Sequence, residues 1–315
     1  MALGNRSPGS GRLHHPLARR HTNADVNKGE AQQQCATGRL HVTRIAYHDG
    51  VRLQDYLARI RVAGPAGPDL DTLRRTHLAH REAFLFENVA IQTGGSIHLG
   101  VADLERKFLD EGRGGYCFEH NTLYAAALRD LGFAPVTLLG RVRRGPPERW
   151  CRTHMVLRIA IPDSGVDYLA DVGFGGLGLL DPIPFREREP SMQGGLQYAL
   201  RREHGLWVLS ATDAWGMQDL YEFSDDPQTP WDVEVANHFT STHPESVFRR
   251  TLTIQRARRD ERLILRNAIL TRIVDRRSID EPIDPTRIRA AARDYFGVDL
   301  PARPLLFEEF AAATS

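Results

Sequence analysis

Hydrophobic residues follow two different periods along this chain, first that of helices and then that of strands. Residues 41–131 carry apolar side chains at helical spacing, which predicts a mainly helical segment. One face of its first helix collects Leu53, Tyr56, Leu57 and Ile60. One side of the second helix collects Leu73, His77, Leu78 and Arg81. Asp71 is expected to cap this second helix, and Gly132 is expected to end a third, predicted over residues 118–131.

Further along the chain, short β-branched or alternating runs are separated by Gly, Pro and Asp, which predicts strands. The predicted strands cover residues 136–143, 154–161, 167–172, 197–202 and 207–210. Residues 251–258 and 262–266 are expected to form a hairpin, and residues 284–295 a late helix capped by Asp284. Helices first, strands second and a mixed end indicate an α+β protein whose strands form an antiparallel sheet or a small barrel.

The first 40 residues show neither period. They are rich in Gly, Arg, His, Asn and Gln, and such a segment buries too little apolar surface to order itself. We therefore predict a disordered extension over residues 1–40. The alternative is that the natural protein begins near Leu40 and that the preceding residues are not made in the cell.

The bulk composition argues against several classes of protein. A formal net charge of +1, with 41% hydrophobic and 26% charged residues, gives no broad footprint for nucleic acid or an anionic membrane. No apolar run approaches the ~18–20 residues of a membrane-spanning helix, and the start lacks the apolar core of a secretory signal. Three cysteines, an odd number, argue against a disulfide framework. We therefore expect a cytoplasmic protein with free thiols.

The most informative segment for chemistry is residues 112–121, GRGGYCFEHN. Its glycines allow a sharp turn and a close approach of the backbone. Cys117 then stands at the start of the predicted third helix, where unpaired N–H groups and the positive end of the helix dipole favour a thiolate and can hold an oxyanion. Beside a histidine, such a cysteine has its pKa lowered from ~8.5 to roughly 3.5–7.5. The segment thus indicates a nucleophilic thiol.

A thiolate nucleophile needs a base, and the base needs a group that orients it. His154 opens one predicted strand, and Asp171 lies near the end of the next, 17 residues later. A hairpin of these two strands would set His154 near Asp171. The order Cys117, His154, Asp171 is that of a papain-like triad, and we predict that these three residues are catalytic.

Each of these residues also has a structural explanation: a packed cysteine, a hydrogen-bonding histidine and a turn-forming aspartate. Their joint occurrence on these elements favours nucleophilic catalysis. Residues 173–178, GFGGLG, match a dinucleotide-binding pattern, but Pro182 and Pro184 forbid the helix that such a site requires. Cys151 and His154 have a zinc-like spacing without a second ligand pair, so no metal site is predicted.

Three motifs together resemble those of the arylamine N-acetyltransferases. They are RGGYCFEHN at residues 113–121, THMVL at 153–157 and DVGFG at 171–175. Further similarity is found in DYLARI at 55–60, FEN at 86–88 and PESVF at 244–248. The resemblance covers about residues 41–267. The chain departs from it at Leu85, where the family often has proline, and at residues 89–92, which differ from the usual apolar run.

The resemblance implies a fold and a reaction. The fold would comprise an N-terminal helical bundle with the catalytic cysteine (41–131), a central antiparallel β-barrel with the histidine and aspartate (132–240) and a C-terminal α/β lid (241–315). The reaction would be ping-pong transfer of acetyl from acetyl-CoA, the cosubstrate, through a thioester on Cys117 to an aromatic amine, hydrazine or hydroxylamine. His154 would take the thiol proton, and Asp171 would hold the tautomer of His154. No permanently bound cofactor is implied.

The resemblance also carries over binding residues. Phe86 and Phe174 match positions that line the acceptor pocket, and Thr153 and Gly175 match positions near the acyl-CoA site. The expected partners are acetyl-CoA and the amine, with no nucleic acid and no membrane, and the chain is expected to be a monomer or a weak homo-oligomer.

Glu87 and Arg113 lie in two matched motifs, and we predict that they form a buried ion pair that fixes the Cys117 loop. Three other functions are open. The main alternative is a macrolactam-forming amide synthase, which resembles this family and takes its acyl chain from a carrier protein. A binding module would not need the whole triad. A papain-like protease fits poorly, because only 37 residues separate Cys117 from His154 and such proteases keep roughly 130–150 there.

Overall fold

The structure, a computed structural model, describes residues 50–64, 67–162, 164–213, 216–275 and 277–314. All of them belong to one unit, Ile45–Ser315. The predicted disordered extension over residues 1–40 lies outside the described residues. None of the helices in the described ranges has both the length and the apolar character needed to cross a bilayer.

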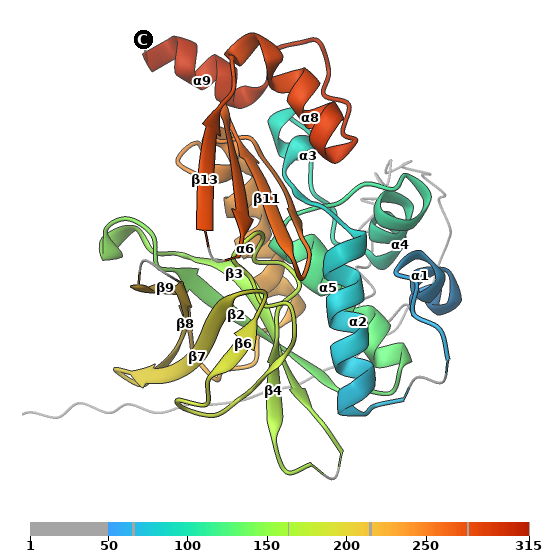
Figure 1. The fold of residues 1–315 in the computed structure, drawn as a ribbon. Coiled ribbons are helices and arrows are strands. Elements are labelled where there is room, and N and C mark those ends of the chain that lie inside the picture. The colour runs from blue at the N-terminus through green and yellow to red at the C-terminus, as the bar shows by residue number, and fades with distance from the viewer. Residues whose placement is uncertain (1–49, 65–66, 163, 214–215, 276, 315) are drawn as a thin grey trace, which may run out of the picture. The chain divides into compact units, whose positions relative to one another are not determined.

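The first part of the unit is helical, as predicted (Figure 1). Its helices are α1 (Leu53–Arg59), α2 (Leu70–Ala83), α3 (Val89–Gln92), α4 (Val101–Glu105), a π-helical turn (Arg106–Asp110) and α5 (Cys117–Asp130). The expected apolar face of α1 is buried at Tyr56, Leu57 and Ile60. The cap predicted for α2 is wrong, because Asp69 and not Asp71 accepts from the Thr72 N–H group, at 2.7 Å, and α2 begins directly after it.

Helix α5 runs through the middle of the core. Every residue from Cys117 to Leu128 is buried, and the alanines at 125–127 let neighbouring elements pack close to it. The helix ends where Gly132 adopts φ +89°, a left-handed conformation that glycine tolerates. The predicted third helix is thus confirmed, with its start one residue earlier, at Cys117.

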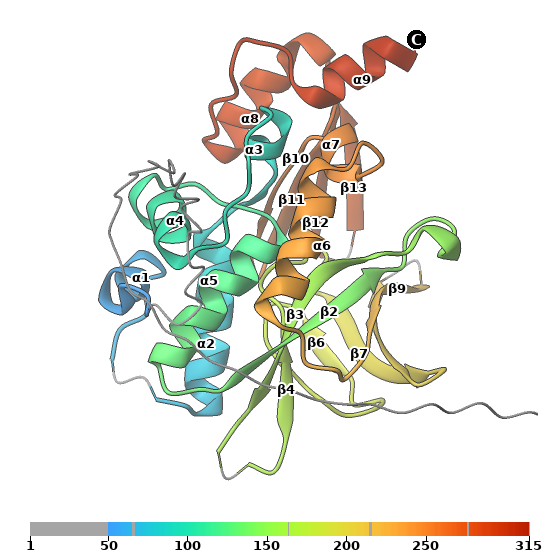
Figure 2. The same cartoon turned by 180° about the vertical axis from the view of Figure 1, so that it is seen from behind.

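Eight antiparallel strands follow and curl into a nearly closed barrel (Figures 1 and 2). They lie in the order β5-β4-β3-β2-β9-β8-β7-β6. Their bounds are β2 (Pro135–Val142), β3 (Arg152–Ala160), β4 (Asp167–Ala170), β5 (Ile183–Pro184), β6 (Ser191–Gln193), β7 (Leu196–Glu203), β8 (Leu206–Asp213) and β9 (Gly216–Phe223). A 3₁₀ turn, Pro147–Arg149, lies between β2 and β3. The five predicted strands correspond to β2, β3, β4, β7 and β8.

A second antiparallel sheet has the order β1-β10-β11-β12-β13. Its strands are β1 (Phe86–Glu87), β10 (Thr253–Ala257), β11 (Glu261–Arg266), β12 (Ile269–Val274) and β13 (Arg277–Pro282). The predicted hairpin is β10–β11. Strand β1 comes from the helical part of the chain and pairs with β10, Phe86 opposite Gln255. The helical segment and the C-terminal segment therefore share one sheet.

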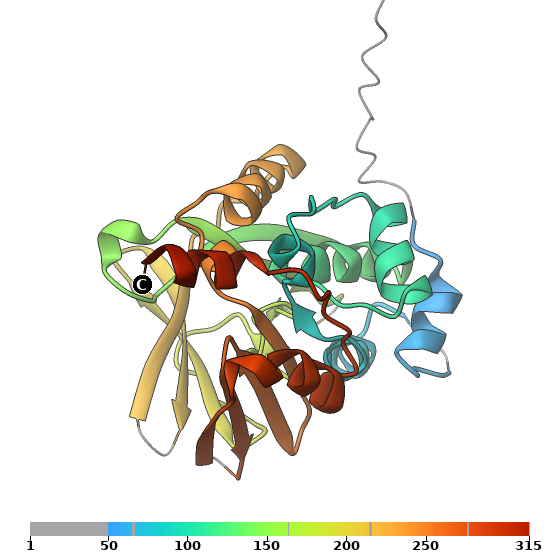
Figure 3. The ribbon, with the colours of Figure 1, turned by 90° about the horizontal axis from the view of Figure 1, so that it is seen from above.

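Four further helices complete the unit: α6 (Pro230–Thr242), α7 (Val247–Arg250), α8 (Ile288–Phe296) and α9 (Leu306–Thr314). Helix α6 crosses β3 (Figure 2), and α8 and α9 lie at one end of the second sheet (Figures 1 and 3). Buried side chains of α8, such as Ile288 and Phe296, join the apolar core of that sheet. The predicted late helix is capped by Asp284, as expected, but begins as a 3₁₀ turn, Pro285–Arg287.

Candidate active site

Cys117 is the first residue of α5 and is almost entirely buried, 3% exposed. Its Sγ lies 3.5 Å from the Thr153 carbonyl oxygen, to which the thiol donates. Gly173 packs directly on the cysteine, since a Cβ at that position would stand 2.8 Å from the Cys117 Cα. The segment after β4 is therefore in contact with the nucleophile, and glycine is required at the point of contact.

The glycines before Cys117 allow the close approach expected of them. A Cβ on Gly114 would stand 1.8 Å from the Leu85 carbonyl oxygen, and a Cβ on Gly115 would meet the Glu119 carboxylate at 2.6 Å. The Gly115 N–H group donates to that same Leu85 oxygen at 3.2 Å. The loop before the nucleophile is thus pressed against the strand β1 region with no room for side chains.

His154 and Asp171 come together as the sequence predicts. Strands β3 and β4 form an antiparallel pair, with Leu157 opposite Ala170, and Asp171 follows directly after β4. His154 Nε2 lies 2.8 Å from Asp171 Oδ2, and both side chains are buried. An ionised carboxylate only accepts, so Nε2 carries the proton and Nδ1 is left as the basic nitrogen of the imidazole.

Asp171 is kept ionised by its surroundings. Burial alone would raise its pKa, but the charge of His154 and hydrogen bonds from His154, Asn121 and the Gly173 N–H group outweigh burial and lower the pKa to about 2. Asn121 Nδ2 donates to Asp171 Oδ1 at 3.0 Å and to the Met155 carbonyl oxygen at 2.7 Å. Asn121 therefore ties α5 to both strands that carry the histidine and the aspartate.

His77 of α2 holds the backbone of Asp171. The Asp171 N–H group donates to His77 Nε2 at 3.1 Å, so the His77 proton lies on Nδ1, which donates to the Leu180 carbonyl oxygen at 2.9 Å. Burial lowers the pKa of His77 to about 4, which keeps the ring neutral and able to accept. Neither His77 nor Asn121 was assigned a role from the sequence, although both lie on segments that it singled out.

The thiol pKa differs from the sequence-based expectation. Burial raises the pKa of Cys117, the negative charge of Asp171 adds to this effect, and the Met155 and Phe118 N–H groups act in the opposite direction. The start of the helix does not outweigh desolvation. An isolated thiolate is therefore disfavoured, and removal of the thiol proton requires a base close at hand that takes up the charge.

Aromatic rings surround the His154 imidazole. The Phe174 and Tyr221 rings lie 5.1 and 4.7 Å from it, centroid to centroid, and 5.1 Å from each other. Phe86, the other predicted acceptor residue, has its ring 6.2 Å from His120 and 6.1 Å from Phe248. Phe174 thus lies directly against the histidine, whereas Phe86 lies on the α5 and α7 side. Tyr221 was not predicted, because β9 was missed in the sequence.

Thr153 and Gly175, the two positions predicted near the acyl-CoA site, lie on the segments that carry His154 and Asp171. Thr153 precedes His154 in β3, and its carbonyl oxygen is the acceptor of the Cys117 thiol. Gly175 has φ +84°, and a Cβ there would meet Gln255 Oε1 at 2.6 Å. Glycine at 175 therefore satisfies both a left-handed backbone and a close contact with β10.

Two ion pairs support the loop before Cys117. The predicted pair is present: Arg113 Nη2 and Nε lie 2.6 and 3.1 Å from Glu87 Oε1, with the Glu87 side chain fully buried. The second pair, missed in the sequence, joins Lys107 Nζ to Glu119 at 2.6 Å. Glu119 also accepts from the Tyr116 N–H group at 3.1 Å, which anchors the first turn of α5.

A chain of buried polar rings lies behind the site. His120 Nε2 donates to the Leu85 carbonyl oxygen at 3.0 Å, so His120 Nδ1 accepts from His80 Nε2 at 2.9 Å. His80 Nδ1 in turn accepts from the Tyr56 hydroxyl at 2.8 Å. Burial lowers the pKa of His80 well below its usual value and that of His120 to about 3. The hydrogen bonds therefore require both histidines to be neutral.

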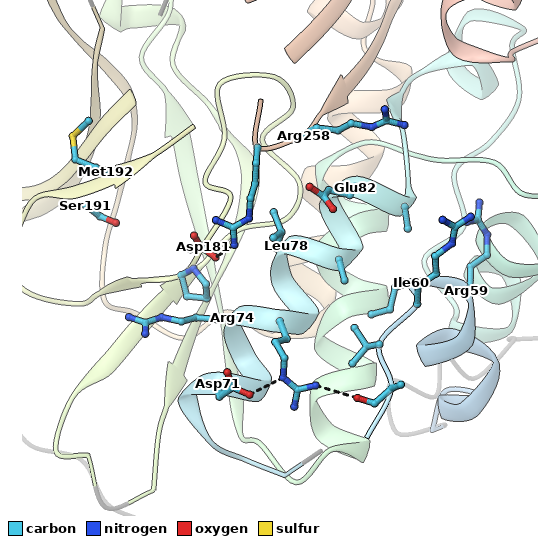
Figure 4. Close-up of a pocket in the computed structure, with 18 residues that line it drawn as sticks. Arg59, Ile60, Asp71, Arg74, Leu78, Glu82, Asp181, Ser191, Met192 and Arg258 are labelled. Atoms are coloured by element: carbon cyan, nitrogen blue, oxygen red, sulfur yellow. Dashed lines mark hydrogen bonds and ion pairs between the residues drawn. The ribbon is translucent and has the colours of Figure 1, made fainter. Parts of the chain in front are cut away.

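A groove of about 1130 Å³ runs along α2 (Figure 4). Its lining includes Asp71, Arg74, Leu78 and Glu82 of α2, and it continues to Asp181 and Arg258. Cys117, His154 and Asp171 do not line it. Within the described ranges, no group of three or more His, Cys, Asp and Glu side chains has the arrangement of a metal site.

Comparison with known proteins defines the class. A family model described as N-acetyltransferase matches residues 69–305. An arylamine N-acetyltransferase of Mycolicibacterium smegmatis is 36% identical over 259 residues, which cover 79% of this chain and 92% of that protein. One of Escherichia coli is 33% identical, covering 78% of this chain and 88% of that protein. The structure of the Mycobacterium marinum arylamine N-acetyltransferase in complex with CoA has a TM-score of 0.74 and 33% identity, covering 78% of this chain and 92% of that one.

These matches and the site geometry place the chain among the acyltransferases. The chain belongs to the arylamine N-acetyltransferase family.

Proposed function

We propose that the protein transfers an acetyl group from acetyl-CoA to the nitrogen of an aromatic amine, hydrazine or hydroxylamine, with Cys117 as nucleophile, His154 as base and Asp171 as its orienter. The observation that carries the proposal is the buried His154–Asp171 pair, 2.8 Å apart, in which His154 directly follows Thr153, whose carbonyl oxygen accepts the Cys117 thiol hydrogen bond. The matched relatives are named for this activity, and the structure of one of them is a complex with CoA.

In the first half-reaction, the Cys117 proton moves to His154 Nδ1 as the sulfur attacks the acetyl carbonyl carbon. Because burial raises the pKa of Cys117, proton transfer and attack are coupled, and Asp171 stabilises the imidazolium that forms. The N–H groups of the first turn of α5, which have no partner within the helix, would donate to the developing oxyanion. The bond between the acetyl carbon and the CoA sulfur then breaks, and His154 returns its proton to the CoA thiolate.

In the second half-reaction, the amine nitrogen attacks the thioester on Cys117. His154 takes a proton from that nitrogen and gives it back to the cysteine sulfur as the amide is released. Phe174 lies against His154 and offers aromatic surface to an aromatic acceptor at the reacting atom. Phe86, on the α5 and α7 side, is proposed as a second aromatic contact of the acceptor, and Thr153 and Gly175 are proposed to border the path of the acyl donor.

The experiment is intact-protein mass spectrometry after mixing wild type and Cys117→Ser with acetyl-CoA, followed by a pulse of an arylhydrazine. Wild type should gain one acetyl group that the hydrazine removes, and Cys117→Ser should gain none. If wild type gains no acetyl group, acetyl-CoA is not the donor, and a carrier-bound acyl chain, as in a macrolactam-forming amide synthase, takes its place. An adduct that persists in Cys117→Ser would assign the nucleophile elsewhere.

A further inference from the structure

The loop that follows Asp171, residues 172–178, is held by side chains rather than by a sheet. We call these residues the glycine loop. Its backbone groups form hydrogen bonds with four side chains: Arg81 of α2, Tyr198 of β7, Gln255 of β10 and Arg262 of β11. Side chains from α2, the barrel and the second sheet thus together hold the backbone of the glycine loop.

Arg81 brackets the part of the loop that carries Phe174. Its Nη1 donates to the Val172 carbonyl oxygen at 3.3 Å, and its Nη2 donates to the Gly175 carbonyl oxygen at 2.5 Å. The planar guanidinium presents these two donors in a fixed geometry, so both ends of the segment are set by one side chain. Between the two ends, Gly173 packs on Cys117, and the Phe174 ring packs on His154.

The second half of the glycine loop, residues 176–178, is held by side chains of β7, β10 and β11. Arg262 donates to the Gly176 carbonyl oxygen and, at 3.1 Å, to that of Gly178. Gln255 Oε1 accepts from the Gly176 N–H group at 2.5 Å, and Tyr198 donates to the Leu177 and Gly178 oxygens at 2.9 and 3.1 Å.

Burying two arginine side chains to hold this loop carries a large desolvation cost. Arg81 and Arg262 are 4% and 2% exposed, and neither forms an ion pair with a carboxylate of the described residues. Burial lowers the pKa of Arg81 to about 10, and the like charge of Arg262 contributes to this shift. Neutral donors would satisfy the same carbonyls at a lower desolvation cost. A buried charge without an opposite charge beside it is unfavourable for stability, and such unfavourable features are found mainly at functional sites.

We propose that Arg81 is a positioning residue for acceptor selection, which acts by holding Phe174 against His154. This inference rests on the proposed acetyl transfer. It assigns to Arg81 a larger effect on the second half-reaction with aromatic acceptors than on acetylation of Cys117. Phe174 is the side chain of the loop that is assigned to the acceptor, whereas toward the acyl donor the loop contributes only the Gly175 backbone. Arg81 reaches no reacting atom and acts only through the Val172 and Gly175 carbonyls.

The test compares Arg81→Lys with a matched control on the same helix, Arg74→Lys, whose side chain is exposed in the groove of Figure 4. Lysine keeps the charge but cannot reproduce the fixed pair of donors. Two single-turnover rates are measured: acetylation of Cys117 by acetyl-CoA, and its deacetylation by an arylhydrazine or by unsubstituted hydrazine. Hydrogen exchange of the peptide that spans the glycine loop is measured in parallel.

In Arg81→Lys we expect faster exchange of the glycine loop. The ratio of arylhydrazine to hydrazine deacetylation rates should fall about tenfold, and the rate of Cys117 acetylation should fall less than this ratio does. Arg74→Lys should match wild type in all readings. In a Phe174→Leu background, Arg81→Lys should no longer change the ratio, since the residue through which it acts is gone. If Arg81→Lys does not fold, Gln255→Leu loosens the same loop without a buried charge and should lower the ratio as well.

Unchanged loop exchange in Arg81→Lys overturns the inference, and so does increased exchange with an unchanged ratio. An equal fall of both half-reactions also overturns it, because Arg81 would then support the triad as a whole. Failure of wild type to accept acetyl is a separate result, which removes the proposed function, while the exchange measurement still shows whether Arg81 holds the loop.

Discussion

At the scale of single residues, the proposed site combines a cysteine whose pKa is raised by burial with a histidine that is held in one tautomer. The Asp171 carboxylate fixes the proton of His154 on Nε2, and the Asp171 pKa of about 2 keeps that carboxylate charged at any pH at which the protein works. If Cys117 and His154 act as proposed, the reactivity of Cys117 depends on transfer of its proton to His154.

This dependence predicts the behaviour of a His154→Gln variant toward iodoacetamide. Wild-type Cys117 should be alkylated readily at pH 7. In the variant, alkylation should be slower by about 100-fold at pH 7 and should increase continuously toward high pH, as expected for a thiol whose pKa is raised. Peptide mass spectrometry measures Cys117 separately from Cys151, which is exposed and serves as the control in the same sample. Equal labelling of Cys117 in both proteins at pH 7 would contradict the role of His154.

The triad residues could be predicted from the sequence because each stands at a recognisable place on a local element. The residues that support them could not. His77 lies 94 residues from the backbone group that it accepts from, and Asn121 lies 50 residues from Asp171. Helical periodicity placed His77 and Arg81 on one side of α2, and both are buried, but periodicity does not say what a buried side chain contacts.

At the scale of elements, the start of α5 is held by side chains from the preceding segments. Arg113 pairs with the fully buried Glu87, and Lys107 pairs with Glu119. The Glu87 carboxylate also accepts from the Val89 N–H group at 2.7 Å. These contacts connect β1, the π-helical turn and the first turn of α5, so the position of Cys117 depends on charges that are largely shielded from solvent.

An Arg113→Met variant should accordingly lose stability. The substitution leaves the buried Glu87 carboxylate without its cation, and we expect a loss of about 3 kcal/mol, near the low end for such pairs because Arg113 is 34% exposed. Urea unfolding measures the loss. The control is Arg106→Met, whose ion pair with Asp103 is exposed and should contribute less than about 1 kcal/mol. Equal midpoints for the two variants would show that the Glu87–Arg113 pair is not a structural requirement.

Elements with a clear period and clear end signals were predicted well, as α5 and the β10–β11 hairpin illustrate. The missed elements lack such signals. Strand β1 has two residues and exists only because β10 pairs with it, and the π-helical turn at Arg106–Asp110 continues α4 without a break in the pattern. Helix α6 was missed although the sequence contains two start signals for it, the Thr229 cap and a proline at the first helical position.

At the scale of the whole molecule, buried neutral histidines make the fold sensitive to acid. His77, His80 and His120 have folded-state pKa values below the usual 6.5, so the unfolded chain binds more protons than the folded one between the two values. Their contribution is present above about pH 6.5 and is lost as the pH falls, toward about 4 for His77 and toward about 3 for His120. Asp171 adds a loss only below its usual 3.8, toward 2.

Urea unfolding at pH 5 and at pH 7.5 measures this effect. His77 alone should account for about 2 kcal/mol of lost stability at pH 5. A His77→Asn variant should show a smaller difference between the two pH values, while His98→Gln, which replaces an exposed histidine, should show the wild-type difference. A His77→Asn protein with the full wild-type difference would show that other groups cause the acid sensitivity.

The pairing of β1 with β10 has a consequence for the order in which the chain is assembled. The Thr253 N–H group donates to Asn88 at 2.8 Å across 165 residues, and the Phe307 N–H group donates to Gln92 at 2.9 Å across 215 residues. Contacts of such sequence separation close large loops and form slowly. During synthesis, Cys117, His154 and Asp171 all leave the ribosome before Gln255 and Arg262, which hold the glycine loop. A growing chain therefore contains Cys117, His154 and Asp171 for some time before it contains two of the residues that hold the glycine loop beside them.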